Sequence, residues 1–458
     1  MKQSTIAAVS TPPGSGGIAV IRVSGPEART VASRIFRPRK GSVEGMRGHT
    51  CTFGRVFDQK GELDDCVLTW FEGPRSYTGE DTAEFSVHGG VFLAQAVLRA
   101  ALDAGAEPAR PGEFTRRACE NGKLSLTQAE AVMDLISAEG RSAARAALSA
   151  RDGALSRALA SPTEALLSLS AHLAAYIDFP EEDVPELRPG NVRASLAGVR
   201  DSLDGLLATE KPARQLRQGI STAIVGRPNV GKSSLMNALA GCRRSIVTAT
   251  PGTTRDVVEE YVSMDGLTLR LADTAGIRET DDPVEREGVL LAEERLRAAD
   301  LVLAVFDLSA PPDPSDRRVR DACARVSRET PVIAVLNKSD LPPHPDMETF
   351  ASGLGRTVVI SAGQERGLDA LWDAVREATR LAALDPSAAM LANERQRDAA
   401  KRAHAAVCQA LEDLDAGWTL DVISIPAEEA LSALLELRGD RLTDTVLDAV
   451  FDRFCVGK

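Results

Sequence analysis

The chain has 458 residues, of which 43% are hydrophobic and 26% charged, and its formal net charge is −12. At roughly 100–200 residues per domain these values predict a globular protein of about two to four domains. They exclude a uniformly basic surface, so any RNA contact would need a local basic patch.

The seven cysteines form no CxxC pair, which disfavours a disulfide framework or a structural zinc site and indicates a reducing compartment. We see no signal peptide and no apolar run of about 18–20 residues, and therefore expect a cytoplasmic protein without a membrane span.

Residues 1–120 carry short apolar runs that are separated by glycine and proline. Examples are Gly17–Val23, Cys66–Phe71 and Thr82–His88. Such runs predict strands, and the segment as a whole predicts a mixed α+β domain.

A helical pattern begins near Leu124. Thr127 and Glu130 have the spacing of a capping box, and apolar residues follow at helical intervals. The alanine-rich pattern continues to about Glu210 and is interrupted at 179–190 by four acidic residues and three prolines.

From Ile220 onward, predicted strands alternate with helices, which indicates a parallel sheet wound with helices. Met264-Asp265-Gly266 is a turn signal that predicts one hairpin within this pattern. After about Leu381 the chain returns to alanine-rich helix. The predicted strands are Ile220–Val225, Leu267–Ala272, Leu301–Phe306, Pro331–Leu336 and Thr357–Ile360.

These patterns predict four segments along the chain. Residues 1–120 form the N-terminal domain, 121–213 and 381–458 are helical, and 214–380 form the α/β domain. Because the two helical segments share composition, we favour one helical domain with the α/β domain inserted over two separate helical domains. Insertions enter domains at exposed loops, and the ends of a domain often lie close together.

The segment Gly226-Arg-Pro-Asn-Val-Gly-Lys-Ser233 matches the phosphate-loop motif GxxxxGK[ST]. It follows a predicted strand and opens a predicted helix, so backbone N–H groups and the helix N-terminus can bind phosphate. We expect Lys232 to reach the β- and γ-phosphates and Ser233 to ligate Mg²⁺.

Three further strand-end segments indicate that the nucleotide is GTP. In Asp273-Thr-Ala-Gly276 the carboxylate can bind the metal through water, and the Gly276 N–H can reach the γ-phosphate. In Asn337-Lys-Ser-Asp340 the carboxylate can accept two hydrogen bonds from guanine that adenine cannot supply. Ser361-Ala362 fits a backbone contact to the base. Their placement agrees with ligand binding at the carboxyl ends of a doubly wound sheet.

Between the phosphate loop and Asp273, either Thr253 or Thr254 is expected to complete the Mg²⁺ shell. Ile277 stands where Ras-like proteins place a water-orienting glutamine, so catalysis needs another group. Nearby candidates are Arg255, Arg278 and Glu279.

The predicted GTP site combines the phosphate loop, the threonine-rich segment after it and the three strand-end segments. It comprises Asn229, Val230, Gly231, Lys232, Ser233, Ser234, Thr248, Ala249, Thr250, Pro251, Gly252, Thr253, Thr254, Asp273, Thr274, Ala275, Gly276, Asn337, Lys338, Asp340, Ser361 and Ala362.

Several segments outside the nucleotide-site motifs also carry recognisable sequence: Ser10–Gly14, Ile21–Gly25, Tyr77–Asp81, His88–Gly90, Pro111–Ala118, Asn121–Ala131 and Phe454–Lys458. On these segments and the GTPase motifs together, the whole chain resembles the family of tRNA-modification GTPases called MnmE or TrmE. The resemblance extends over all three regions and is not limited to the GTPase motifs, which many Era-like proteins share.

The resemblance implies an N-terminal domain that binds folate and forms a homodimer, followed by a helical domain that the GTPase domain interrupts. It also implies action with a flavoprotein partner, MnmG (GidA), in a heterotetramer in which FAD belongs only to the partner. The implied product is a carboxymethylaminomethyl or aminomethyl group at C5 of the wobble uridine, position 34, of certain tRNAs. A tetrahydrofolate derivative, either 5,10-methylene or 5-formyl, would carry the one-carbon unit.

By the family pattern Arg22, Glu84 and Lys123 line the folate pocket, together with the terminal Lys458. Cations suit the carboxylates of the glutamate tail, and a carboxylate suits the N–H donors of the pterin.

The resemblance further implies activation by potassium. Asn229, with Thr248, Thr250 and Thr253, would hold K⁺ near the phosphates, where it would stand in for an arginine finger. Two such domains would meet across their nucleotides, and Glu279 would orient the attacking water.

Cys455, within the terminal Cys-Val-Gly-Lys segment, is a candidate for the modification step, although the sequence gives no general base beside it. The other reading of Cys455 is a buried, small apolar side chain.

Two other functions compete with tRNA modification. The first is an Era-like GTPase switch in ribosome assembly, which would need an RNA-binding appendage, but no G-x-x-G loop follows Leu381. The second is a stand-alone folate-dependent transferase, which leaves the GTPase motifs unexplained.

The sequence marks a tRNA-binding surface only weakly. Two basic runs could contact tRNA, but such runs are more often solvated surface. They are Arg34, Arg37, Arg39 and Lys40, and Arg110, Arg116, Arg117 and Lys123.

Overall fold

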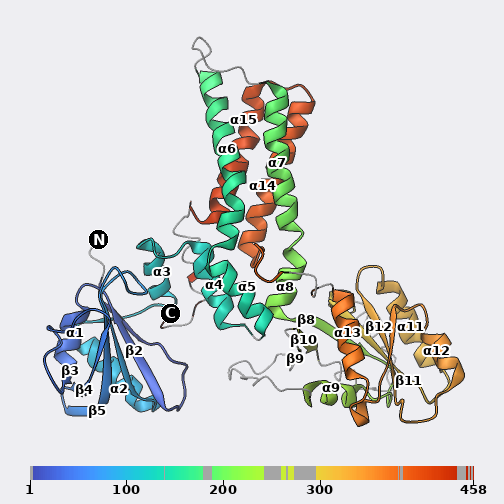
Figure 1. The fold of residues 1–458 in the computed structure, drawn as a ribbon, viewed down its shortest axis with the longest axis horizontal. Helices are drawn as coiled ribbons and strands as arrows, with labels where there is room; N and C mark the ends of the chain where they lie inside the picture. Colours follow the sequence, from blue (N-terminus) through green and yellow to red (C-terminus); the bar gives the residue numbers. More distant parts are fainter. Residues whose placement is uncertain are drawn as a thin grey trace, which may run out of the picture. The chain divides into compact units, whose positions relative to one another are not determined.

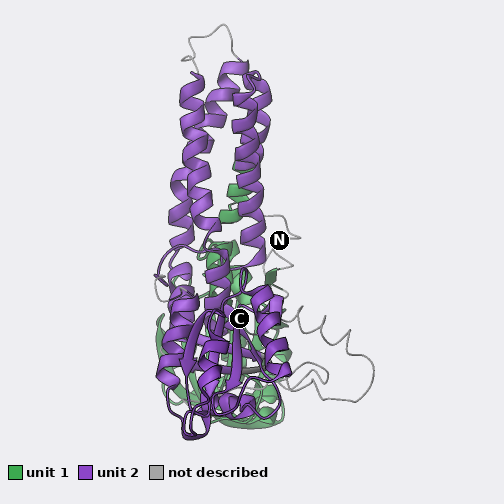
Figure 2. Ribbon diagram, turned by 90° about the vertical axis from the view of Figure 1, so that its right-hand side faces the viewer, with its two compact units in different colours: residues 1–133, 431–458 green, residues 134–430 purple. Residues whose placement is uncertain are grey.

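The computed structural model describes residues 4–138, 140–178, 188–241, 259–264, 267–272, 296–379, 381, 385–440, 450–451, 454 and 457. The chain divides into two compact units, which Figure 2 distinguishes by colour. One contains residues 1–133 and 431–458, and the other contains residues 134–430.

A seven-stranded sheet forms the centre of the first unit, in the order β3-β4-β5-β6-β2-β1-β7. All neighbours are antiparallel except β1 and β7. Figure 1 shows α1 and α2 beside this sheet. The elements are β1 (Ile6–Val9), β2 (Ile18–Ser24), α1 (Ala28–Ile35), β3 (Phe36–Pro38), β4 (Thr50–Asp58), β5 (Gly61–Phe71), β6 (Thr82–His88), α2 (Val91–Asp103), β7 (Glu107–Pro108) and α3 (Glu113–Glu120).

Alternation of side chains along β2 gives this sheet two different faces. Ala19, Ile21 and Val23 are buried in one core with residues of α1 and α2, whereas Arg22 lies on the opposite face, because successive strand residues point to opposite sides. The predicted α+β domain is confirmed, and its three predicted strands correspond to β2, part of β5, and β6.

Helix α4 (Leu126–Ile136) follows α3 along the chain, and its capping residues differ from the prediction. The Ser125 N–H donates to Gln128 Oε1 at 2.9 Å, and the Gln128 N–H donates to Ser125 Oγ at 3.3 Å. The capping box is therefore Ser125 with Gln128, two positions before the predicted pair. Thr127 and Glu130 have the same spacing, but both lie inside the helix and are buried.

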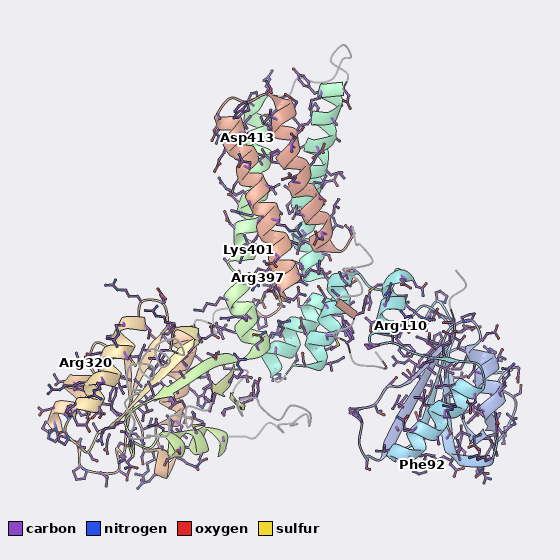
Figure 3. All side chains as sticks on the ribbon, turned by 180° about the vertical axis from the view of Figure 1, so that it is seen from behind. Phe92, Arg110, Arg320, Arg397, Lys401 and Asp413 are labelled. Atoms are coloured by element: carbon purple, nitrogen blue, oxygen red, sulfur yellow. The ribbon has the colours of Figure 1, made fainter. Side chains whose placement is uncertain are left out.

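Helices from before and after the α/β domain pack together in the second unit. Arg397 and Lys401 of α14, labelled in Figure 3, both form ion pairs of 3.2 Å with Glu210 of α8, and His404 Nε2 lies 2.9 Å from Asp204 Oδ1 of α7. This packing confirms a helical domain that the α/β domain interrupts. Its helices within the second unit are α5 (Arg141–Arg151), α6 (Ala154–Asp178), α7 (Pro189–Leu207), α8 (Glu210–Gln218) and α14 (Glu394–Asp415). Helix α15 (Leu420–Arg438) begins in the second unit, and its residues from 431 onward belong to the first.

The inserted domain contains a six-stranded sheet in the order β13-β12-β11-β8-β10-β9. Every residue of β11 and β12 is buried, as expected for parallel strands covered by helices on both faces. The elements are β8 (Ile220–Val225), α9 (Lys232–Gly241), β9 (Glu259–Met264), β10 (Leu267–Ala272), β11 (Leu301–Asp307), α11 (Pro314–Val326), β12 (Val332–Asn337), α12 (Pro345–Ala351), β13 (Arg356–Val359), the 3₁₀ helix η2 (Ala362–Gln364) and α13 (Leu368–Thr379).

The strand predictions for this domain are confirmed within one residue at each end. The predicted hairpin is also confirmed, because β9 and β10 are antiparallel with Met264 opposite Leu267. Asp265 and Gly266 of the turn lie outside the described residues. Among the helices that the structure describes, none has both the length and the apolar character that a membrane span requires.

Candidate nucleotide-binding site

The phosphate loop connects the carboxyl end of β8 to the N-terminus of α9 and covers residues 226–231. A Cβ atom at Gly231 would lie 2.2 Å from Asn337 Nδ2, and one at Gly226 would lie 2.4 Å from the Val305 carbonyl oxygen. Gly231 also has a φ of 96°, a left-handed value that favours glycine. Both positions of the motif therefore require glycine for steric reasons.

The Lys232 side chain folds back over the phosphate loop. Its Nζ donates hydrogen bonds to the carbonyl oxygens of Gly226 at 2.7 Å and Arg227 at 2.9 Å. Ser233 and Ser234 are exposed in the first turn of α9, while Val230 is fully buried. The loop therefore places an ammonium group, two hydroxyl groups and a helix N-terminus together, which is an anion-binding arrangement.

Asn337 connects three of the predicted GTP-binding segments. This side chain is 2% exposed at the end of β12. Its Nδ2 donates to the Val230 carbonyl oxygen at 2.8 Å, and its Oδ1 accepts from the Ala362 N–H at 2.9 Å. The phosphate loop, the Asn-Lys-Ser-Asp segment and the Ser-Ala segment thus meet at one edge of the sheet.

Asp340 carries the carboxylate that is predicted to bind guanine. Ser361 Oγ donates to its Oδ1 at 2.6 Å. This hydrogen bond is the main cause that lowers the pKa of Asp340 from its ordinary value. The carboxyl group is therefore ionised at neutral pH, as acceptance of two hydrogen bonds from a base requires.

The structure adds Asp307, which the motifs did not include. Lys338 has a left-handed φ of 67°, and its Nζ lies 2.6 Å from Asp307 Oδ2. Burial acts to raise the pKa of Asp307, but hydrogen bonds from Lys338 and Ser309 outweigh it and lower the pKa. The sequence did contain a signal for Asp307. It is an acidic residue directly after the predicted strand Leu301–Phe306, and that strand ends at the same edge of the sheet as the strand that ends in Asn337.

Much of the predicted site lies outside the described residues and stays a prediction. The residues concerned are Thr248, Ala249, Thr250, Pro251, Gly252, Thr253, Thr254, Arg255, Asp273, Thr274, Ala275, Gly276, Ile277, Arg278, Glu279, Cys455 and Lys458.

Two of the predicted folate residues face each other in the first unit. Arg22 of β2 is opposite Glu84 of β6 in the strand register, and Arg22 Nε lies 2.8 Å from Glu84 Oε1. The Arg22 guanidinium carbon is 5.5 Å from the centre of the Tyr77 ring and 5.4 Å from that of Phe114. Its Nη1 is buried and has no hydrogen-bond partner among the residues that the structure describes.

Lys123 lies between α3 and α4, and its side chain reaches the loop that joins β5 to β6. Its Nζ donates to the Pro74 carbonyl oxygen at 2.9 Å. Near Lys458, the Gly457 carbonyl oxygen accepts from Ser10 Oγ at 3.1 Å, and the Ser10 N–H donates to the Val20 carbonyl oxygen at 2.8 Å. These two hydrogen bonds connect Gly457, through Ser10, to Val20 of β2. Val20 is two residues before Arg22 in the sequence.

Arg117 is a buried structural arginine, although the basic run to which it belongs is of a kind that more often forms solvated surface. It is 5% exposed, its Nη1 lies 3.3 Å from Glu80, and its Nη2 lies 2.9 Å from Glu113. Ser24 Oγ also donates to Glu80 at 2.8 Å. This network fixes the Tyr77–Asp81 segment, which the sequence marked only through its resemblance.

A parallel sheet wound with helices, a glycine-dependent phosphate loop and an adjoining Asn-Lys-Ser-Asp segment define a P-loop GTPase. A family model described as the MnmE helical domain matches residues 126–455, and one described as the GTP-binding protein TrmE N-terminus matches residues 5–123. The chain belongs to this MnmE family.

Full-length relatives agree with that assignment. The chain is 42% identical to the tRNA modification GTPase MnmE of Heliobacterium modesticaldum, with 100% of both chains covered. The values for Symbiobacterium thermophilum MnmE are the same, and Geobacillus kaustophilus MnmE is 40% identical over 99% of each chain. Among solved structures, the G domain of the T. maritima FeoB iron transporter is 26% identical and covers 35% of this chain and 98% of its own, with a TM-score of 0.25.

Proposed function

We propose that this protein hydrolyses GTP to drive modification of tRNA at C5 of the wobble uridine, in concert with the flavoprotein MnmG. The observation that supports GTP hydrolysis is the pair of hydrogen bonds made by the Asn337 side chain. They join the phosphate loop to the Asn-Lys-Ser-Asp and Ser-Ala segments that are predicted to bind guanine. The tRNA half rests on relatives that are 40–42% identical over nearly all of both chains and are named tRNA modification GTPases.

Within the nucleotide site each residue has a distinct role. Lys232 and the N-terminus of α9 stabilise the charge on the β- and γ-phosphates. Asp340 accepts hydrogen bonds from N1–H and the 2-amino group of guanine, and Ser361 keeps that carboxylate oriented. Of the residues outside the described part of the chain, Asp273 would hold the metal through water and Gly276 would donate to the γ-phosphate. Glu279 would orient the attacking water in place of the glutamine of Ras-like proteins.

Two cations belong to this proposal. Ser233 and Thr254 would hold Mg²⁺, and the exposed hydroxyl of Ser233 in the first turn of α9 offers the hard oxygen donor that Mg²⁺ prefers. Asn229, whose φ of 65° is left-handed, would hold K⁺ together with Thr248, Thr250 and Thr253. When bound, such cations would supply positive charge against the negative charge of the phosphates.

A tetrahydrofolate derivative would bind on the face of the first unit that carries Arg22 and Glu84. The buried Arg22 Nη1, which has no partner among the described residues, supports this fit because such a donor is costly unless a ligand accepts from it. Glu84 would accept from the pterin N–H groups, and Lys123 and Lys458 would pair with ligand carboxylates. The folate supplies the one-carbon unit.

The assembly is also a proposal. Residues 1–120 would form the folate-binding and dimerising domain, 121–213 with 381–458 the helical domain, and 214–380 the GTPase domain. Two copies would join MnmG in a heterotetramer, in which the partner holds FAD and Cys455 takes part in the modification step.

Mass spectrometry of wobble nucleosides from a deletion strain tests the proposal. We expect the C5-modified uridine to disappear, to return with the wild-type gene, and not to return with Lys232→Ala. Nucleosides that are unchanged by the deletion would overturn tRNA modification and favour a ribosome-assembly switch. A separate measurement of hydrolysis in potassium and sodium tests the K⁺ site, and equal rates would remove it.

A further inference from the structure

We propose that Arg227 and the buried Asp316 form a clamp that positions the phosphate loop for GTP hydrolysis. The proposal rests on the nucleotide site above and adds two residues to it, neither of which belongs to the phosphate-loop consensus or to the guanine segment. They act through the loop backbone and are positioning residues.

The clamp joins the second residue of the loop to the start of α11. Arg227 Nε lies 3.1 Å from Asp316 Oδ2 and 3.4 Å from Asp313 Oδ2. The Asp316 side chain is fully buried, whereas the side chains of Arg227 and Asp313 are 20% and 41% exposed. The Asp316 contact is therefore the desolvated one, and its geometry is the more constrained of the two.

Asp316 is fixed by the cap of α11 as well as by Arg227. Asp313 is the N-cap, and its side chain accepts from the N–H groups of Ser315 at 2.7 Å and Asp316 at 3.0 Å. In return, the Asp313 N–H donates to Asp316 Oδ2 at 3.1 Å. This capping box holds the Asp316 carboxylate in one orientation, so that it can serve as a fixed anchor for the loop.

The buried carboxylate depends on Arg227 for charge compensation. Asp316 Oδ1 is buried and has no hydrogen-bond partner within the described part of the chain. Burial is the main cause that raises the pKa of Asp316, and Arg227 opposes that shift. Because a buried ionised carboxylate without a partner is strongly unfavourable, the pair couples the loop tightly to α11.

The loop is consequently fixed on both sides of Asn229. On one side Arg227 is bound to α11, and its carbonyl oxygen accepts from Lys232 Nζ at 2.9 Å. On the other side the Val230 carbonyl oxygen accepts from Asn337. Asn229 lies between these points in a left-handed conformation, which asparagine adopts more readily than other non-glycine residues.

Four variants separate positioning from stability. Arg227→Gln removes the cation, Asp316→Asn removes the anion but keeps an oxygen for the cap, and the double variant removes both charges. Asp313→Ser is the matched control, because serine retains the N-cap acceptor and loses only the more exposed contact with Arg227. For each protein we would measure the melting temperature, the affinity for GDP and kcat for GTP.

We expect kcat to fall about tenfold or more in Arg227→Gln, since small displacements of reacting groups have large kinetic effects. The melting temperature should also fall, because Asp316 loses its partner. The double variant should recover the melting temperature but not kcat, and Asp313→Ser should keep kcat within about twofold of wild type.

Recovery of kcat together with the melting temperature in the double variant would overturn the clamp and leave a purely structural ion pair. An unchanged kcat in Arg227→Gln would overturn it as well. Wild-type protein that failed to hydrolyse GTP would refute the proposed function along with the clamp. Wild-type activity without potassium dependence would refute only the K⁺ site, because the kcat ratios do not depend on it.

Discussion

Arg22 and Glu84 form an ion pair of 2.8 Å between neighbouring strands, and their side chains are 14% and 24% exposed. The pair occupies directly opposed positions of β2 and β6, where cross-strand partners are closest. It lies on the face of the sheet away from α1 and α2, and there it can hold the guanidinium ready for an anionic or carbonyl ligand.

Glu84→Gln is expected to weaken binding of 5-formyltetrahydrofolate at least tenfold, since a hydrogen bond to a charged group contributes about 1.5–3 kcal/mol. Isothermal titration calorimetry would measure the change. Glu62→Gln is the matched control, because Glu62 forms a 2.7 Å pair with Arg55 in the same domain but both side chains are about half exposed. Equal affinities in the two variants would contradict the folate site.

Asp340→Asn is expected to change the preferred base. An amide cannot accept two hydrogen bonds from guanine, whereas it can donate to the 2-oxo group of xanthine. We expect affinity for GTP to fall about 100-fold or more and affinity for XTP to rise, as measured with fluorescent nucleotide analogues. Asp346→Asn, at an exposed position of α12, should change neither affinity; a similar loss there would argue against a specific base contact.

Asn337→Ala is expected to affect stability and nucleotide binding together. It would leave the Val230 carbonyl oxygen and the Ala362 N–H without their present partner. At about 1–3 kcal/mol for each buried group left unpaired, calorimetry should detect a clear fall in the melting temperature of the GTPase domain. Nucleotide that restored full stability to the variant would show that these two bonds are dispensable.

Asp307→Asn gives a prediction about pH. The pKa of Asp307 is lower in the folded protein than its ordinary value of 3.8, so the ionised pair with Lys338 stabilises the fold above that value. This stabilisation is lost as the pH falls through the lowered pKa. The variant should therefore be less stable than wild type at pH 7, and the difference in urea midpoint should shrink between about pH 5 and pH 3. A difference that stayed constant over that range would contradict the assignment.

Cys455→Ser is expected to keep GTP hydrolysis and to lose tRNA modification, if the thiol takes part in the modification step. Nucleoside analysis of a complemented deletion strain would measure the second activity. Cys51→Ser, at an exposed cysteine of the first unit, serves as the control. Normal modification by the Cys455 variant would assign that residue a packing role.

Local pattern predicted the strands of the GTPase domain well because each apolar run is short, and the runs of β8, β11 and β12 are largely buried. Ile220–Val225 matched β8 at both ends, and the turn signal after β9 gave the correct hairpin. The capping box at the start of α4 shows the limit of this reasoning. Ser125 with Gln128 and Thr127 with Glu130 have equal spacing, and only the position of the first helical residue decides between them.

Contacts between distant segments could not be read from spacing. The motifs indicated that Asn337 and the phosphate loop share a site, but not that the amide bonds directly to Val230. Arg117 gave a misleading signal, because its buried position depends on Glu80 and Glu113 around it. Side-chain burial of this kind is decided by tertiary packing, which one sequence does not display.

The interrupted helical domain has a consequence for synthesis. Helix α7 ends at Leu207, and its packing partner α14 begins at Glu394, so at 5–20 residues per second the ribosome needs roughly 10–40 s to produce the segment between them. During that interval the nascent α6 and α7 expose apolar surface while the GTPase domain, whose strands are close together in sequence, can already fold. The order of assembly is thus set by topology, and chaperone contact before release is expected at the first half of the helical domain.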